Sequence, residues 1–78
     1  MFIEFKKSAI KFLEKLNKKE QTRIITSVEK IPQGDIAPLH GKKITVYRLR
    51  VGKYRIIFTI ENNIAIVADI DSRGDVYK

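Results

Sequence analysis

The hydrophobic positions near the start of the chain recur with the period of an α-helix. A first stripe contains Ala9, Phe12, Leu13 and Leu16, and after Asn17 a second stripe contains Ile24, Ile25, Val28 and Ile31. Pro32 and Gly34 then end the pattern. The spacing predicts two amphipathic helices in a hairpin, with Ser8 as the cap of the first helix and a short strand at 2–5 before it. The apolar sides of both helices need a sheet to cover them.

Between Val46 and Ile60 the period changes to two, on both sides of the pair Gly52-Lys53. Glycine at the first central position predicts a type II′ hairpin turn. This register pairs Val51 with Tyr54, Arg50 with Arg55, Leu49 with Ile56 and Tyr47 with Phe58. One face then carries an expected core, made of Tyr47, Leu49, Val51, Tyr54, Ile56, Phe58 and Ile60. The other face carries three basic residues, Arg48, Arg50 and Arg55.

The end of the sequence predicts one more strand beside this hairpin. Residues 61–63, Glu-Asn-Asn, indicate a three-residue turn before a buried strand at 64–68. With that turn, Ile64, Ile66 and Ile70 face the core and Asp69 lies opposite Arg55, whereas a two-residue turn would bury Asp69. Continued alternation places Asp71, Arg73 and Tyr77 on the arginine face. Segment 33–43, which holds the only histidine, His40, is predicted to be a loop with His40 exposed.

Composition limits the classes of protein that the chain can belong to. Its 78 residues, 44% hydrophobic and 32% charged, predict a single globular domain over 1–78. With no cysteine and one histidine, we expect no disulfide, no metal site and no cofactor. The sequence has no hydrolase triad spacing and no phosphate-binding glycine loop. It also has no apolar run of the length of a membrane span or signal peptide, so we expect a cytoplasmic protein without membrane contact.

The formal charge of +7 favours a polyanionic partner, such as RNA, DNA or an acidic protein. Arg50 and Arg55, about 5–6 Å apart across the predicted hairpin, repel by on the order of 1 kcal/mol in water. Because guanidinium groups match phosphate and carboxylate, the arginine face is interpreted as an anion site; the alternative is that the long side chains spread into solvent. Four lysines of the first helix are interpreted as a solvated face, with nucleic-acid contact as the alternative. They are Lys7, Lys11, Lys15 and Lys18.

The order of these features resembles the RelE/ParE superfamily of bacterial and archaeal toxins. The matching residues are Pro38, Leu39 and Gly41, then Tyr47, Arg48, Arg50, Gly52, Tyr54 and Arg55, and finally Arg73, Val76 and Tyr77. The resemblance covers essentially the whole chain. It implies an α+β fold, in which an N-terminal helical hairpin packs on one face of an antiparallel β-sheet and the other face is basic. It also implies a toxin of a type II toxin–antitoxin system, held in a hetero-oligomer by a cognate antitoxin.

The same resemblance implies a site made of Arg48, Arg50, Arg55, Arg73 and Tyr77. Arg55 corresponds to an arginine that stabilises charge at the scissile phosphate. Arg48 and Arg50 stand where well-known members have lysines that bind RNA and promote proton removal. Arg73 occupies the basic position of the closing motif, and Tyr77 corresponds to a tyrosine that orients the substrate. The implied reaction is attack of a ribose 2′-hydroxyl on the adjacent phosphate of mRNA in the ribosomal A site.

Two functions stay open at this point. The RelE branch of the superfamily cleaves mRNA on the ribosome, whereas the ParE branch inhibits DNA gyrase without any RNA chemistry. Ser72 stands where many relatives have a histidine, and arginine is a poor general base. The ribosome would compensate in part by fixing the geometry of the mRNA. The sequence therefore favours a ribosome-dependent endoribonuclease, with a gyrase inhibitor as the alternative.

Overall fold

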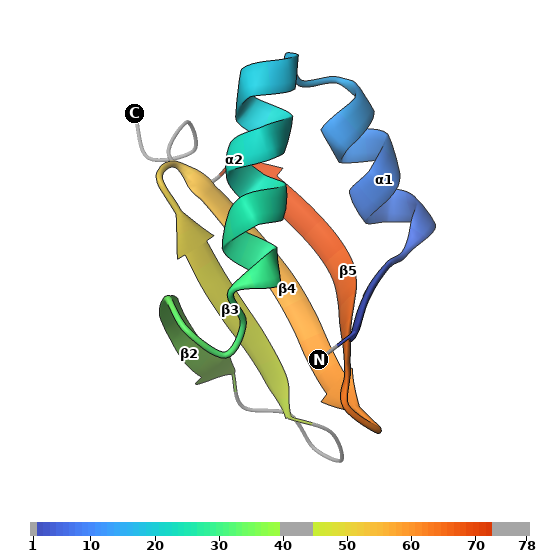
Figure 1. The fold of residues 1–78 in the computed structure, drawn as a ribbon, viewed down its shortest axis with the longest axis vertical. Helices are drawn as coiled ribbons and strands as arrows, with labels where there is room; N and C mark the ends of the chain where they lie inside the picture. Colours follow the sequence, from blue (N-terminus) through green and yellow to red (C-terminus); the bar gives the residue numbers. More distant parts are fainter. Residues whose placement is uncertain (1, 40–44, 73–78) are drawn as a thin grey trace.

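The computed structural model describes residues 2–39 and 45–72, which form two helices and a five-stranded sheet (Figure 1). The elements in chain order are β1 (Phe2–Phe5), α1 (Lys7–Glu14), α2 (Lys18–Glu29), β2 (Asp35–Leu39), β3 (Val46–Val51), β4 (Tyr54–Glu61) and β5 (Ile64–Ser72). Across the sheet the strands lie in the order β1-β5-β4-β3-β2. The predicted α+β class, with a helical hairpin and a sheet, is confirmed.

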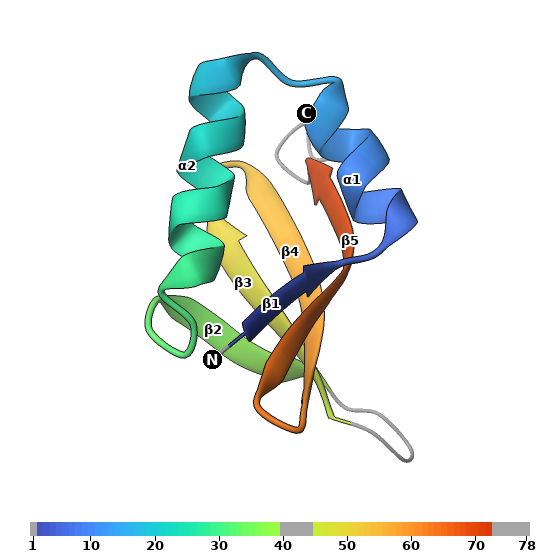
Figure 2. The ribbon, with the colours of Figure 1, turned by 45° about the vertical axis from the view of Figure 1, so that its right-hand side comes forward.

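Both helices pack on the same face of the sheet, α1 beside β5 and α2 across β3 and β4 (Figures 1 and 2). Asn17 separates the helices and caps α2, because its side chain accepts a hydrogen bond from the backbone N–H of Glu20 at 2.9 Å. The prediction that Ser8 caps α1 is wrong. The cap position is Lys6, without a side-chain cap, and the Ser8 hydroxyl instead donates to Asp69 on β5.

The β3–β4 hairpin has the predicted register, with Val51 opposite Tyr54 and Arg50 opposite Arg55. Gly52 adopts a φ of 59°, which the first central position of a type II′ turn requires and which side chains other than glycine rarely tolerate. The neighbouring aromatic pair, Tyr47 and Phe58, stacks with ring centroids 5.4 Å apart. This hairpin therefore fixes the positions of all three arginines on the face away from the helices.

Two parts of the sheet differ from the predictions. The segment expected to be a loop contains β2, which pairs antiparallel with β3 and forms one edge of the sheet. Pro38 lies within β2, which is possible because β2 is an edge strand. Proline and glycine usually indicate a loop, so Pro38 and Gly34 led to the prediction of a loop here. At the other edge β1 runs parallel to β5, so the sheet is mixed rather than wholly antiparallel. The sequence indicated this strand but not its direction.

The connection between β4 and β5 corrects a third prediction. Glu61 pairs with Ile64, so the turn has two residues, Asn62 and Asn63, both with left-handed φ values of 49° and 63°. A β-bulge then shifts the register between Ile57 and Phe58. The bulge reverses the alternation along β5, so a two-residue turn does not bury Asp69.

Because of this bulge, β5 presents other residues than predicted to the helices. Ala65, Val67 and Ile70 are buried, whereas Ile64 and Ile66, which were expected in the core, are not. Asp69 lies opposite Ile57, and it is Asp71 that lies opposite Arg55. The expected pairing of Asp69 with Arg55 is therefore wrong by two positions.

The core lies between the helices and the sheet. From the helical segment it takes Ala9, Leu13, Ile24, Val28 and Ile31, and from the hairpin Leu49, Val51, Tyr54, Ile56 and Phe58. Tyr47 is only partly buried and Ile60 is 36% exposed, so the predicted core face is less complete at its ends. Phe12 packs edge-on against Tyr54 at 6.0 Å, which attaches α1 to the hairpin. Because the helices cover one face of the sheet, the polar side chains of the strands lie on the opposite face.

Candidate functional site

A row of four charged residues crosses the face of the sheet opposite the helices. Asp35 on β2 lies opposite Arg50 on β3, Arg50 lies opposite Arg55 on β4, and Arg55 lies opposite Asp71 on β5. Arg48, two positions from Arg50 on the same strand, points to the same face. The row therefore has two cations at its centre and one carboxylate at each end.

Arg55 and Asp71 form an ion pair, with Nη2 of the arginine 3.3 Å from Oδ2 of the aspartate. Both side chains are partly exposed, 31% for Arg55 and 37% for Asp71, so water weakens their attraction. The pair makes a single rather long contact instead of a two-point bond. It orients the two groups relative to each other and adds little to the stability of the fold.

Three polar atoms at this site are buried and have no hydrogen-bond partner within residues 2–39 and 45–72. They are Nε of Arg48, Nε of Arg55 and Oδ1 of Asp71. A buried polar group without a partner costs free energy. Two of the three atoms are charged donors and the third is an acceptor. Because these atoms have less than 1 Å² of accessible surface, they lie beneath the surface of the arginine face and are not the atoms that a ligand meets first.

The structure brings together three of the five residues predicted for the site. Arg48, Arg50 and Arg55 share one face, as expected. Arg73 and Tyr77 lie outside the described residues. The alternation also predicts Asp71 on this face, but the predicted three-residue turn places Asp69, and not Asp71, opposite Arg55. The β-bulge that exchanges the two aspartates leaves no clear signal in the sequence.

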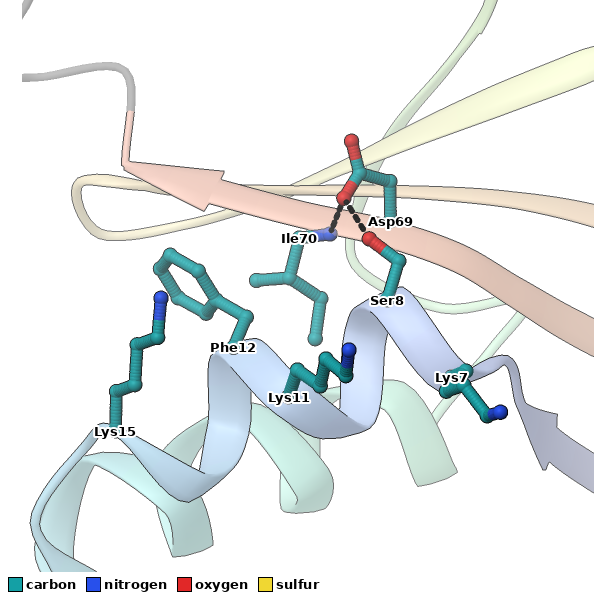
Figure 3. Close-up of a pocket in the computed structure, with 7 residues that line it drawn as sticks. All are labelled: Lys7, Ser8, Lys11, Phe12, Lys15, Asp69 and Ile70. Atoms are coloured by element: carbon teal, nitrogen blue, oxygen red, sulfur yellow. Dashed lines mark hydrogen bonds between the residues drawn. The ribbon is translucent and has the colours of Figure 1, made fainter.

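A second basic region lies along α1, where its side chains and β5 enclose an open hollow of about 460 Å³ (Figure 3). Lys7 and Lys11 of α1 and Lys15, the cap residue directly after the helix, line it at intervals of four residues. In the part of the chain that the structure describes, none of these lysines forms an ion pair. Asp69 is also in the lining, and its Oδ1 accepts bonds from the Ser8 hydroxyl and the Ile70 N–H, both at 3.0 Å. The three lysine charges are thus left available to a partner.

Residues 2–39 and 45–72 contain no group of three or more histidine, cysteine or acidic side chains that would hold a metal ion. No helix in these two ranges has the length and apolar character needed to cross a membrane.

This fold is similar to that of chains in solved RelE–RelB complexes. The chain is similar to one in the archaeal RelE–RelB complex from Pyrococcus horikoshii OT3, with a TM-score of 0.76, 24% identity and 94% of each chain covered. It is also similar to one in the RelB–RelE antitoxin–toxin complex from Methanococcus jannaschii, with a TM-score of 0.73, 25% identity, and 95% of this chain and 94% of that chain covered. For the toxin–antitoxin complex RelBE2 from Mycobacterium tuberculosis the TM-score is 0.77, the identity 20%, and the coverage 95% and 92%.

The family model for the ParE toxin of the type II toxin–antitoxin system, parDE, matches residues 3–77. The chain belongs to this family and, with it, to the RelE/ParE superfamily of toxins. A search among curated proteins gives no match. The resemblance inferred from the order of motifs is thereby confirmed at the level of the superfamily.

Proposed function

We propose that this toxin is a ribosome-dependent mRNA endoribonuclease that inhibits translation. The observation that carries the proposal is the group of three arginines, Arg48, Arg50 and Arg55, that share the face of the sheet away from the helices. They point to an anionic ligand at the centre of the basic face. A phosphodiester supplies such oxygens, and guanidinium groups bind phosphate with defined geometry.

In this mechanism a ribose 2′-hydroxyl attacks the adjacent phosphate of the mRNA. Negative charge grows on the phosphate oxygens in the transition state, and fixed cations lower its energy because they need no reorganisation. Arg55 is proposed to stabilise that charge, while Arg48 and Arg50 hold the RNA backbone. Arg73 and Tyr77 keep the roles that the superfamily resemblance gives them, in phosphate binding and in orienting the substrate.

The partner that we propose is a cognate antitoxin. The similar solved structures are complexes of RelE with RelB, which supports a hetero-oligomer of toxin and antitoxin for this chain as well. The formal charge of +7 favours an antitoxin segment rich in carboxylates. If the toxin acts on ribosomes, it acts in the cytoplasm, which is the location that we propose.

The lysines of α1 are proposed to add to RNA affinity. Lys7, Lys11 and Lys15 follow each other at intervals of about 6 Å along the helix, since each residue rises 1.5 Å. Like charges at this spacing repel slightly, and a polyanion removes that cost. Phosphates bound by lysines release condensed counterions, which is a large part of nucleic-acid affinity.

The test of the proposed function is a purified translation system with ribosomes stalled on a defined mRNA. Addition of the toxin should produce cuts in the A-site codon, and the same mRNA without ribosomes should stay intact. Mapping of the 5′ ends gives the position of each cut. Intact ribosome-bound mRNA at toxin concentrations that stop protein synthesis would reject the proposal.

The alternative function is inhibition of DNA gyrase, which the ParE description of the matching family favours. In that case the basic face binds its target without chemistry. A supercoiling assay with purified gyrase, run beside the translation assay, separates the two functions. Trapped cleaved DNA with normal protein synthesis would establish the alternative, and blocked translation with normal supercoiling would exclude it.

A further inference from the structure

The hollow between α1 and β5 combines three kinds of accessible side chain (Figure 3). Its cations are Lys7, Lys11 and Lys15, its aromatic side chain is Phe12, and its carboxylate is Asp69. The lysines and Asp69 are exposed and Phe12 is partly exposed, so a ligand in the hollow touches all three kinds. The volume of about 460 Å³ lies in the usual range of small-ligand sites.

A row of phosphates alone would use only part of this hollow. The lysines suit an anionic backbone, but Asp69 repels phosphate, and the ring of Phe12 offers a phosphate no favourable contact. Figure 3 shows this ring beside Lys15, on the side of the helix that faces β5. A ligand that uses the whole hollow is anionic, has an aromatic group and carries N–H donors for the carboxylate. A nucleotide has all three properties.

We propose that the hollow is a nucleotide site, which takes one unpaired base of a single-stranded RNA whose phosphates are held by the lysines. The base packs against the exposed part of Phe12 and donates a hydrogen bond to Asp69. The inference rests on the proposed function for the choice of RNA as the ligand, and it adds a contact to a base, which that function does not include. Because Phe12 and the lysines belong to the helical segment, this site is separate from the arginines assigned to cleavage.

The spacing of the lysines favours an RNA strand over a free nucleotide. Lys7 and Lys15 are eight residues apart, which corresponds to about 12 Å along a helix axis. This length exceeds one phosphate group, so different phosphates of one strand would contact the two ends of the hollow. Asp69 is fixed between them, because its Oδ1 accepts hydrogen bonds from the Ser8 hydroxyl and the Ile70 N–H.

The test is a thermodynamic cycle with a short 2′-O-methyl RNA, which cannot be cleaved because its 2′-oxygens carry no proton. Its dissociation constant is compared with that of the same backbone without bases, for the wild-type toxin and for Phe12→Leu. Both oligonucleotides carry the same phosphates, so the ratio of their dissociation constants reports the bases alone. Stacking of a base on an aromatic side chain is worth roughly 5- to 150-fold in affinity, so wild type should prefer the base-bearing RNA by at least about fivefold. F12L should lose at least about fivefold of this preference.

Phe5→Leu is the matched control. Phe5, like Phe12, is a partly buried aromatic residue packed against the core, but it lies on β1 and does not line the hollow. F5L should keep the wild-type preference for the base-bearing RNA. The preference should also stay the same from low to high salt, because the phosphates of the two oligonucleotides contribute equally. Thermal unfolding shows whether each variant is folded.

An equal preference in wild type and F12L, or an equal loss in F5L, would overturn the inference. Equal binding of the two oligonucleotides by wild type would overturn it even if F12L does not fold. Adenosine monophosphate should not displace the RNA at concentrations near the dissociation constant of the RNA, and displacement there would overturn the assignment to an RNA strand. None of these measurements needs cleavage. Intact ribosome-bound mRNA would therefore reject the proposed function, while the cycle still decides whether the hollow holds a base.

Discussion

Arg50 and Arg55 lie directly opposite each other across the β3–β4 hairpin, and each has an aspartate on its outer side. From the sequence, the repulsion of these like charges indicated an anion site, and the compensation that the predicted register offered was Asp69 opposite Arg55. The structure supplies part of that compensation, since Asp71 pairs with Arg55. Within residues 2–39 and 45–72, Arg48 and Arg50 form no ion pair, so an anionic ligand would still find two uncompensated cations on this face.

Replacing Arg55 by alanine should abolish toxicity without unfolding the protein. The side chain lies on the face away from the core, so its loss leaves no core cavity, and its exposed ion pair contributes little stability. Loss of one group that stabilises transition-state charge typically lowers a rate by roughly 10²- to 10³-fold. Growth after induced expression and single-turnover cleavage measure the function, and thermal unfolding measures the stability.

The control for this variant is Phe58→Ala. Phe58 is fully buried in the core, and truncation of a core aromatic typically costs roughly 3–5 kcal/mol, which is a large part of the stability of so small a domain. Both variants should lose toxicity, but only F58A should lose its cooperative unfolding transition. A large drop in the melting temperature of R55A would instead show that the arginine is structural.

The lysines of α1 should affect RNA affinity rather than the chemical step. A triple variant with Lys7, Lys11 and Lys15 changed to glutamine removes three potential phosphate contacts, each worth close to one unit in the dependence of log affinity on log salt. The slope measured for binding to ribosomes should become shallower by roughly 2–3 units. The rate of cleavage at saturation should stay unchanged, because the lysines lie on α1 and not on the arginine row.

A matched triple variant tests whether position matters beyond total charge. Lys18, Lys19 and Lys30 are also exposed, and none of them lines the hollow between α1 and β5. Their change to glutamine removes the same three charges and should alter the salt slope much less. Equal effects of the two triple variants would mean that only net charge attracts the ribosome, and that the hollow has no special part in it.

The turn between β4 and β5 predicts an effect on stability alone. Asn63 has a φ of 63°, a left-handed conformation that costs an alanine about 1 kcal/mol and a glycine nothing. Asn63→Ala should therefore lower the free energy of unfolding by about this amount, whereas Asn63→Gly should preserve it. Denaturant unfolding measures both. A destabilised N63G would show that the asparagine side chain, and not the backbone conformation, holds the turn.

This turn also shows where sequence reasoning reaches its limit. The helices and the β3–β4 hairpin were predictable because their burial follows a fixed period and Gly52 marks the turn. The register of β5 was not, since two asparagines fit either a two- or a three-residue turn and the bulge adds one residue without a sequence signature. One such residue decides which aspartate faces Arg55. The arginines of the site were thus predictable from the sequence, whereas the aspartate that faces Arg55 was not.

The antitoxin is expected to bind through apolar anchors as well as through charge. Its carboxylates would pair with some of Arg48, Arg50, Arg55 and Arg73, or its bulk would keep the toxin out of the ribosome. Exposed ion pairs are each worth little, so they cannot alone supply a tight complex. Phe2, at 73% exposure, and Ile10, at 43%, are exposed apolar side chains that an antitoxin segment folding on the toxin would cover.

The measurement is the dissociation constant of the toxin–antitoxin complex from low to high salt. Salt screens the charged contacts between the partners but leaves apolar burial in place. We therefore expect moderate weakening with tight residual binding, and we expect Phe2→Ser to weaken the complex at high salt by a larger factor than any single arginine change. Complete dissociation in moderate salt would show that charge alone holds the pair, because no apolar contact would remain to resist screening.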